Sequence, residues 1–554
     1  MRLPALALSA LALASCSPAT PQGDDSDATS TIDPARLAQN VQVLASDEFL
    51  GRGPATPGED TTIAWIAEQF RAAGMEPGGP NGSWYQEVPL EQADIVGQPA
   101  LSFTVAGRRQ PLTQGEQIAV RASMRGVDRV DIENAPLVFL GYGVKAPERK
   151  WDDFQGQDLR DKIGIVLIND PDFETGEGDF GGKAMTYYGR WTYKYEEAAR
   201  QGLAGLLIVH ETEPASYGWA TVKNSNTNTM FDIVRQNPAE VHPLVEGWIQ
   251  RDVAVELFKA AGQDFEALKR QARTRGFRPV PLGDATFSAR YAVRRATIRS
   301  RNVLGRLPGS AHPDETILYG AHWDHLGVGA PDARGDSIYN GAVDNATGVA
   351  ALIELGRAFA AGPRPERSIV LAAWTAEEKG LLGSEYYAAN PVYPLETTVA
   401  GFNIDALAPT GPSRDVLVVG YGQSELEDRL ERLLTADRRV IARDPHPEAG
   451  YFYRSDHFPM AKRGVPMLYI DSGVDLLAGG TAAGEAADSA YRSDRYHQPA
   501  DEYDPATWNV EGIAQDVATL HRLGLDLASS REWPNYRQGS EFRPVRDASA
   551  AKRS

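Results

Sequence analysis

Three short apolar runs in the second half of the chain each lead, within a few residues, to a side chain that can bind a metal. The runs cover residues 316–319, 369–374 and 398–404, and they lead to His322, Glu378 and Asp405. In an open α/β sheet, reactive side chains gather beyond the carboxyl ends of the strands, so residues far apart in sequence can meet. The sequence therefore predicts three strands that end at a shared site.

The rest of this half alternates between strand-like and helix-like segments. After residues 301–305 the alternation is regular, which favours an α/β fold with a mixed, mostly parallel sheet flanked by helices on both faces. Residues 34–90 add two helices with apolar residues about one turn apart, followed by a strand over 83–90. We assign these elements to the same domain.

The composition and the predicted elements change between residues 92 and 285, where short strand candidates lie among long loops rich in glycine and aromatic residues. We interpret this segment as a β-rich unit inserted into the main domain. The predicted division is a signal peptide (1–15), a flexible tether (16–31), the first part of the main domain (32–91), the insert (92–285), the second part with the site (286–540) and a tail (541–554).

The only cysteine, Cys16, follows an apolar stretch at residues 3–14. This stretch is too short to span a bilayer but fits the core of a signal peptide. Residues 13–16 resemble the bacterial lipobox, in which the cysteine receives lipid; an ordinary cleaved signal with an incidental cysteine is the alternative. We therefore expect a protein of the bacterial periplasm or cell envelope, anchored at Cys16 to the outer membrane. With Cys16 so used, any metal must be held by His, Asp and Glu.

The net charge excludes some classes of partner. Lysine and arginine number 56 against 75 aspartate and glutamate, which gives a formal charge of −19. Such a chain repels nucleic acid and anionic membrane surfaces. We predict no nucleic-acid partner, and membrane contact only through the N-terminal lipid.

The first two candidate ligands each have a simpler interpretation. His322 and Asp324 form His-x-Asp at a predicted strand end, a spacing that lets a carboxylate orient a metal-bound imidazole. His325 is a rival ligand, although a structural role is the default for it. Asp344 precedes an amphipathic helix, and a plain helix cap is the alternative.

The remaining candidates strengthen the case as a set. Glu377 and Glu378 could merely start a solvated helix, but one could bind a metal while the other carries protons. Asp405 ends an apolar strand, where a metal would offset the cost of burying its charge. His497 lies in a loop beside Tyr496. Two histidines and three carboxylates form the ligand set expected for two zinc ions that share one carboxylate.

Several motifs together resemble one enzyme family over nearly all of residues 34–525. They are Gly51-Arg52-Gly53 with Thr56-Pro57-Gly58, His322-Trp323-Asp324, Asp344-Asn345-Ala346-Thr347-Gly348, Glu377-Glu378, Asn403-Ile404-Asp405, Arg454-Ser455-Asp456-His457 and Tyr496-His497. This set is similar to the co-catalytic zinc aminopeptidases, which include bacterial leucyl aminopeptidases and glutamate carboxypeptidase II. The resemblance implies the phosphorylase/hydrolase-like zinc exopeptidase fold, and the insert resembles a protease-associated domain.

The resemblance also implies a role for each candidate. His322 with Asp405 would hold one zinc ion and Glu378 with His497 the other, while Asp344 would bridge the two. Glu377 would take a proton from the bridging water, Tyr496 would help to stabilise the oxyanion, and Asp324 would brace His322. A cis peptide bond is implied between Asp344 and Asn345.

The expected activity is that of a metallo-aminopeptidase, a hydrolase that removes residues from peptides with a free N-terminus. A glutamate-type carboxypeptidase and a single-zinc glutaminyl cyclase remain alternatives on the same scaffold. For the carboxypeptidase, the basic residues of segment 183–194 are candidates for holding a terminal carboxylate. A pure binding protein would not need Glu377 besides five ligands, and the sequence has no Gly-x-Ser-x-Gly motif for a serine hydrolase. Side-chain preference, oligomeric state and the choice among zinc, manganese and cobalt have no sequence signature.

Overall fold

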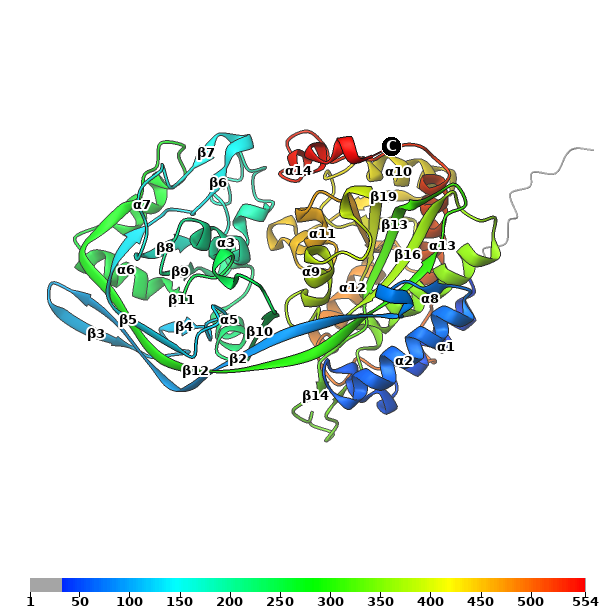
Figure 1. Cartoon of the computed structure of the whole chain (residues 1–554), viewed down its shortest axis with the longest axis horizontal. Coiled ribbons are helices and arrows are strands. Elements are labelled where there is room, and N and C mark those ends of the chain that lie inside the picture. The colour runs from blue at the N-terminus through cyan, green and yellow to red at the C-terminus, as the bar shows by residue number, and fades with distance from the viewer. Residues whose placement is uncertain (1–31, 554) are drawn as a thin grey trace, which may run out of the picture.

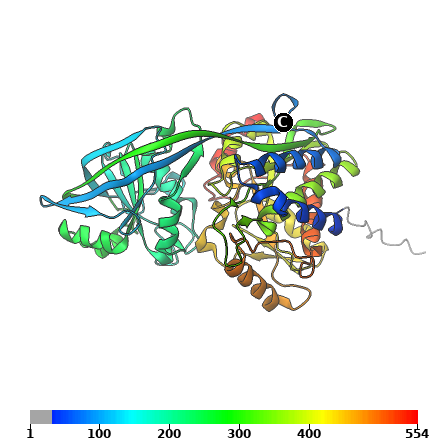
Figure 2. The same cartoon turned by 90° about the horizontal axis from the view of Figure 1, so that it is seen from below.

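Two halves of the molecule lie side by side and are joined by a pair of long strands (Figure 1). The computed structural model describes residues 32–553, so Cys16, the predicted signal peptide and the predicted tether lie outside the described residues. The joining strands are β2 (Tyr85–Val105) and β12 (Val280–Leu307), which pair antiparallel and run through both halves (Figure 2). Within residues 32–553, no helix combines the length and apolar character needed to cross a membrane.

The larger half contains a mixed, mostly parallel sheet. Its strands, in spatial order, are β19 (Val440–Arg443), β18 (Asp415–Val418), β20 (Met467–Ser472), β17 (Thr398–Ile404), β13 (His312–His322), β16 (Arg367–Trp374) and the end of β12. Strands β20, β17, β13 and β16 are parallel to one another. Strand β12 pairs antiparallel with β16, and β18 pairs antiparallel with β20 but parallel with β19. The predicted fold class is confirmed, and the three predicted ligand-bearing strands lie next to one another.

Helices cover both faces of this sheet because its strands are apolar on both sides. On β13, Ile317 and Tyr319 pack into one hydrophobic core, while Leu318 between them packs into another. The first core is covered by α1 (Pro34–Leu44), α2 (Pro57–Ala72), α8 (Thr347–Ala361) and α13 (Glu511–Ala528), and the second by α9 (Leu382–Ala389) and α11 (Phe458–Lys462). The helices predicted near the N-terminus therefore pack on the sheet that carries the site.

The smaller half, which we call the insert, has its own sheet and its own cores. Its strands follow β12 in the order β5 (Arg129–Phe139), β8 (Ile163–Leu167), β9 (Gly205–His210), β11 (Val245–Gln250) and β4 (Ile118–Val120), with helices α3 (Trp191–Arg200), α6 (Arg251–Ala260) and α7 (Phe265–Gln271). Residues 92 and 285 both lie inside the long joining strands. The division of the chain at these residues stays a prediction.

The remaining strands and α-helices complete the fold. They are β1 (Glu76–Pro77), β3 (Arg108–Leu112), β6 (Lys145–Ala146), β7 (Trp151–Asp152), β10 (Met230–Ile233), β14 (Gly327–Val328), β15 (Ile338–Tyr339), α4 (Thr212–Ala215), α5 (Trp219–Asn226), α10 (Leu426–Ala436), α12 (Gly480–Asp494) and α14 (Arg543–Ala548).

A close approach at Gly348 brings the start of α8 to the end of β17. A Cβ atom at Gly348 would lie 2.7 Å from the carbonyl oxygen of Ile404, which only glycine avoids. The amide nitrogen of the Asn345 side chain donates to the same carbonyl at 3.0 Å, and its oxygen accepts from the backbone of Gly348 and Ala406. Asp344 is thereby held beside Asp405.

Candidate metal site

The candidate ligands converge at the carboxyl ends of the central strands. His322 is the last residue of β13, Glu377 and Glu378 follow β16, and Asp405 follows β17. Asp344 lies in the turn Ala342–Ala346 that precedes α8. The parallel arrangement of the three strands places their ends at one edge, as the sequence predicts.

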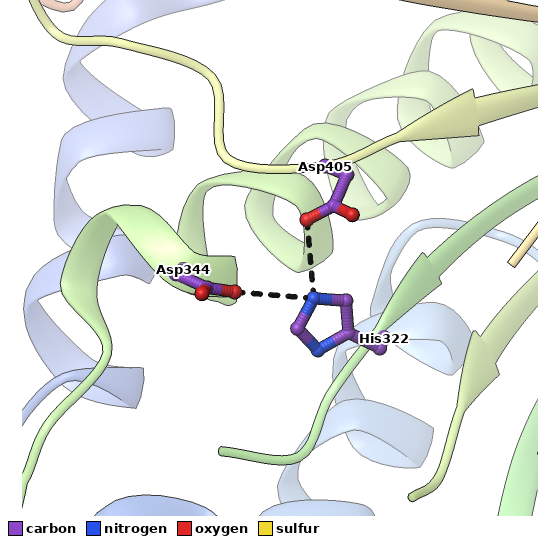
Figure 3. A group of neighbouring side chains, drawn as sticks. All are labelled: His322, Asp344 and Asp405. Carbon is purple, nitrogen blue, oxygen red and sulfur yellow. Dashed lines mark hydrogen bonds and ion pairs between the residues drawn. The ribbon is translucent and has the colours of Figure 1, made fainter. Parts of the chain in front are cut away.

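The first cluster forms around the His322 imidazole (Figure 3). Its Nε2 atom lies 3.1 Å from Oδ1 of Asp405 and 3.2 Å from Oδ1 of Asp344. The His322 side chain is only 2% exposed. One imidazole nitrogen and two carboxylate oxygens therefore meet in a buried space, a donor set suited to zinc.

The second cluster uses the other oxygen of Asp344. Nε2 of His497 lies 3.3 Å from Oδ2 of Asp344 and 3.2 Å from Oε2 of Glu378. His497 belongs to the loop after α12 and is 36% exposed, so this cluster is open to solvent on one side. Asp344 thus touches both clusters, one with each carboxylate oxygen.

His325 also reaches the second cluster. It is fully buried, and its Nδ1 atom lies 2.7 Å from Oε1 of Glu378, although neither atom makes a hydrogen bond of acceptable geometry. His325, Asp344 and Glu378 together can also surround one ion. The sequence interpretation of His325 as a rival ligand therefore stays open beside His497.

The residues present fit a metal on chemical grounds. Burial disfavours a charged imidazole, yet nearby carboxylates, Asp405 first among them, raise the pKa of His322 well above its ordinary value. Hydrogen bonds with Asp344 and Glu378 likewise overcome burial and raise the pKa of His497 to about 10. Metals bind neutral imidazole. A metal at this site would therefore take the place of the protons that the carboxylates otherwise keep on the two imidazoles.

Glu377 belongs to neither cluster, and its backbone is held by Asp324. Its amide nitrogen donates to Oδ1 of Asp324 at 3.0 Å, and its carboxyl group makes no hydrogen bond among the described residues. Burial, and then the charges of Asp405 and Asp456, raise the pKa of Glu377 well above its ordinary value. A carboxyl group in this setting can accept and release a proton.

Asp324 contacts His322 through its backbone. Its carbonyl oxygen lies 3.0 Å from Nδ1 of His322, whereas its carboxylate Oδ1 is 3.9 Å from that atom. The carboxylate instead holds the Glu377 amide. Asp324 therefore has two contacts: its carbonyl group orients the His322 imidazole, and its carboxylate positions Glu377 beside the candidate ligand Glu378.

Tyr496 stacks on His497, with ring centroids 3.9 Å apart and an angle of 24° between the planes. Its side chain is 45% exposed. The ring therefore packs against one candidate ligand of the second cluster, and the predicted role of its hydroxyl group in oxyanion stabilisation stays a prediction.

Two further residues support the ligands, and the sequence assigned neither a role. The Ser455 hydroxyl donates to Oδ2 of Asp405 at 2.6 Å and accepts from the side chain of Asn403. The buried Asp501 carboxylate accepts from the backbone nitrogens of Val343 and Asp344, both at 3.1 Å. Ser455 lies in a motif quoted above and Asp501 follows the Tyr496-His497 motif by four residues, but only the folded contacts reveal what they hold.

The peptide bond between Asp344 and Asn345 is cis, which confirms the prediction drawn from the resemblance. Its position between the shared carboxylate and the Asn345 side chain places it at the centre of the site.

Comparisons with known proteins show a similarity to peptidases. Residues 302–520 match the model of peptidase family M28. The chain is 39% identical over 112 residues to aminopeptidase NAALADL1 of Mus musculus, a match that covers 19% of this chain and 13% of that protein. It is 28% identical over 202 residues to leupeptin-inactivating enzyme 1 of Streptomyces exfoliatus, covering 35% of this chain and 42% of that one.

Among solved structures, an aminopeptidase from Aneurinibacillus sp. strain AM-1 aligns with 89% of this chain and 93% of its own, at 18% identity and a TM-score of 0.47. The chain spans less than half the length of both curated relatives. All five candidate ligands lie within the residues that match the family. The match to peptidase family M28 therefore covers the whole set of candidate ligands.

Proposed function

We propose that the protein is a zinc-dependent aminopeptidase that removes N-terminal residues from peptides. The observation that carries this proposal is the position of Asp344, whose two carboxylate oxygens face different histidine–carboxylate pairs. One zinc ion would be held by His322 and Asp405 and a second by Glu378 and His497, with Asp344 shared. In a glutaminyl cyclase, which would bind a single zinc ion, one of these two pairs would have no metal to hold.

Two zinc ions would supply Lewis acidity and lower the pKa of water at the site toward neutrality. Glu377 would accept the proton of the attacking water at its carboxylate and pass it to the leaving amine. Asp324 would hold Glu377 in place through the backbone amide. The Tyr496 hydroxyl would donate to the oxyanion of the tetrahedral intermediate.

The test is metal analysis combined with a matched pair of substrates. Purified protein should contain close to two zinc ions per chain, and His322→Ala or His497→Ala should lose metal along with activity. A peptide with a free N-terminus should be cleaved, whereas its N-acetylated form should not. One ion per chain with both variants fully active, or equal cleavage of the two peptides, would contradict the proposal.

A second candidate, recognition of a substrate carboxylate, is favoured by two arginines where the insert meets the larger half. Arg190 of the insert is 8% exposed, and its Nε atom has no hydrogen-bond partner among the described residues. Burial, and then the nearby Arg454, lower the pKa of Arg190 to about 9. Arg454 donates to the Ser216 hydroxyl at 3.0 Å and lies over the Tyr217 and Tyr451 rings.

The backbone links one of these two arginines to the candidate site. Arg454 is followed directly by Ser455, which contacts Asp405, and no carboxylate lies within ion-pair distance of Arg190 or Arg454 among residues 32–553. Lys194, the other cation raised by the sequence, is occupied by the carbonyl oxygens of Tyr142 and Asn169. A carboxylate of the substrate could bind between the two arginines. It would be the terminal carboxylate of a short peptide, or the one that a glutamate-type carboxypeptidase holds.

The two candidates differ in which end of the substrate is read. An aminopeptidase requires the free amine, whereas a carboxypeptidase requires the C-terminal carboxylate. Cleavage of an N-acetylated peptide with a free C-terminus, but not of its amide, would favour the carboxypeptidase. The structural role that we propose for the insert is that of a protease-associated domain that covers one side of the site.

We also propose that the mature protein is a bacterial envelope lipoprotein anchored at Cys16. The support is the sequence of residues 13–16 alone. Mass spectrometry of the mature N-terminus should show a lipid-modified Cys16, and an unmodified chain that starts beyond residue 17 would refute the anchor.

A further inference from the structure

Arg52, in the motif Gly51-Arg52-Gly53, is a buried cation whose partners are all backbone carbonyl groups. Its side chain is 1% exposed. Nε donates to Trp323 at 2.9 Å, Nη1 to Leu44 at 2.9 Å and to Asn340 at 2.5 Å, and Nη2 to Gly341 at 2.8 Å. No carboxylate of the described chain comes within ion-pair distance of it.

The four carbonyl groups belong to the segments that carry the ligands and to the end of α1. Trp323 stands between His322 and Asp324, and Asn340 and Gly341 immediately precede the turn that bears Asp344. One side chain from the N-terminal part therefore connects two loops with candidate ligands that lie 271 and 288–289 positions further along the chain.

A second contact links the same segments. The Asn340 side chain donates to the carbonyl oxygen of Ala45 at 2.8 Å and to Asp47 at 2.9 Å. On the opposite side, Asp501 accepts from the backbone nitrogens of Val343 and Asp344. The Asp344 turn is thus held by its carbonyl groups from one side and by its amide groups from the other.

The geometry at Arg52 requires an arginine. A guanidinium group presents five donors in a fixed plane, while a lysine ammonium presents three donors at one atom and cannot reach carbonyl groups on three separate segments. The backbone at Arg52 has a φ of 52°, and a Cβ atom at Gly51 would collide with the carbonyl oxygens of Gly327 and Tyr339. The segment is therefore fixed against the β14–β15 hairpin.

The charge of Arg52 also has a consequence for the site. The carboxylates that face it are Asp501, Asp344, Asp324 and Glu378, of which Asp344 and Glu378 are candidate ligands. Since none of them pairs with it directly, the guanidinium group lowers the repulsion among these carboxylates without competing with a metal for their oxygens.

We propose that Arg52 is a positioning residue that presets the ligand loops and so determines how tightly the site binds metal. This inference rests on the proposed function for the identity of the metal, and it concerns a residue outside the segment that matches the family. Residues that orient metal ligands from behind alter metal affinity by about 10- to 100-fold when they are replaced.

The test compares Arg52→Lys and Arg52→Gln with matched variants of Arg546. Arg546 is 1% exposed and donates to the carbonyl oxygens of Thr398 and Val399 at 3.0 and 3.1 Å, at the end of β17 opposite the site. Full-length protein stripped of metal is titrated with zinc against a chromogenic chelator. Arg52→Lys should weaken zinc binding by about 10- to 100-fold, and Arg546→Lys should leave it as in the wild type.

Hydrogen exchange of the stripped proteins gives a readout that does not depend on zinc. Arg52→Lys should speed exchange in peptides that cover residues 323–325 and 340–346, while Arg546→Lys should not. Equal effects of the two lysine variants, or wild-type affinity and exchange in Arg52→Lys, would overturn the inference. If the wild type binds no zinc, the metal proposal fails, and the exchange comparison still decides whether Arg52 holds the loops.

A measurement on the wild type alone covers the case in which the Arg52 variants do not fold. Because coupling between two parts of a protein is reciprocal, zinc binding should slow exchange in residues 44–53 as well as in the ligand loops. Protection of residues 44–53 supports the inference, and unchanged exchange there contradicts it.

Discussion

The two halves of the molecule differ in what they bring to the site. The larger half carries both candidate metal clusters that the described residues form, on the ends of parallel strands and in the loops between them. The insert contributes no member of these clusters, and it lies outside the residues that match the family. The difference indicates that the candidate site belongs to the larger half and that the insert can influence it only through contacts at the boundary.

Those contacts are numerous and mostly polar or aromatic. Arg235 of the insert lies 3.5 Å from Glu385 of α9, and Lys462 of α11 lies 3.1 Å from Glu196 of the insert. Tyr187 of the insert stacks edge-on against Phe458. Through these contacts the insert can influence which substrates bind at the site without supplying a catalytic group.

The largest effect that would sharpen this comparison is expected from Glu377 in the larger half. Glu377→Gln keeps the shape of the side chain but removes the proton acceptor. We expect kcat to fall by about 10²- to 10⁴-fold while metal content and substrate binding stay near those of the wild type. Steady-state kinetics with metal analysis tests this, and Glu378→Gln is the matched control because it should lose metal. Wild-type turnover in Glu377→Gln would contradict the proposal that Glu377 transfers protons while Glu378 binds metal.

An intermediate effect is expected from Arg190 in the insert. Arg190→Met should raise KM for a dipeptide with a free carboxylate by about 10- to 100-fold, the worth of one charge-assisted hydrogen bond. Turnover of the corresponding dipeptide amide should not change. Arg275→Met is the control, since Arg275 pairs with Asp179 on the surface of the insert. If Arg190→Met slows cleavage of the dipeptide and of its amide equally, the insert does not select substrates through this residue.

The sequence predicted the larger half well because its signals are local. Each ligand-bearing strand is a compact apolar run, and the chemistry follows it directly, as at His322 and Asp405. The role of the Asp324 carboxylate could not be read in this way, because it holds the backbone of Glu377, a contact made only when β13 and β16 lie together.

The choice between His325 and His497 was equally beyond the sequence. The sequence named His325 as a rival ligand, but only the folded chain shows that both imidazoles reach Glu378, one from the end of β13 and one from a distant loop. The limits of the insert could not be fixed because β2 and β12 continue from one half into the other without a break. A change in composition marks where packing changes, but not where a strand ends.

The smallest expected effect concerns a charged network on the insert side of the boundary. His242 lies 2.9 Å from Asp232 and 2.7 Å from Glu246. Asp232 also pairs with Arg235, which reaches Glu385 in the larger half. Burial disfavours the charged imidazole, but Glu246 and Asp232 overcome it and raise the pKa of His242 from 6.5 to about 9.

The sign of the effect on stability follows from this shift. A group whose pKa is raised on folding contributes stability that is complete below its unfolded pKa, near 6.5, and is lost as the pH rises through about 9. Asp232, whose pKa is lowered, contributes stability that is lost only at acidic pH. Replacing His242 by Gln should therefore lower the free energy of unfolding by up to about 3 kcal/mol at pH 6 and have little effect near pH 10. Chemical denaturation of both proteins across this range measures the difference, with His446→Gln, at an exposed site, as the control.

Because the network lies away from the candidate ligands, kcat should stay unchanged in His242→Gln. A loss of kcat comparable to that of Glu377→Gln would show that the insert takes part in the chemistry and not only in substrate selection.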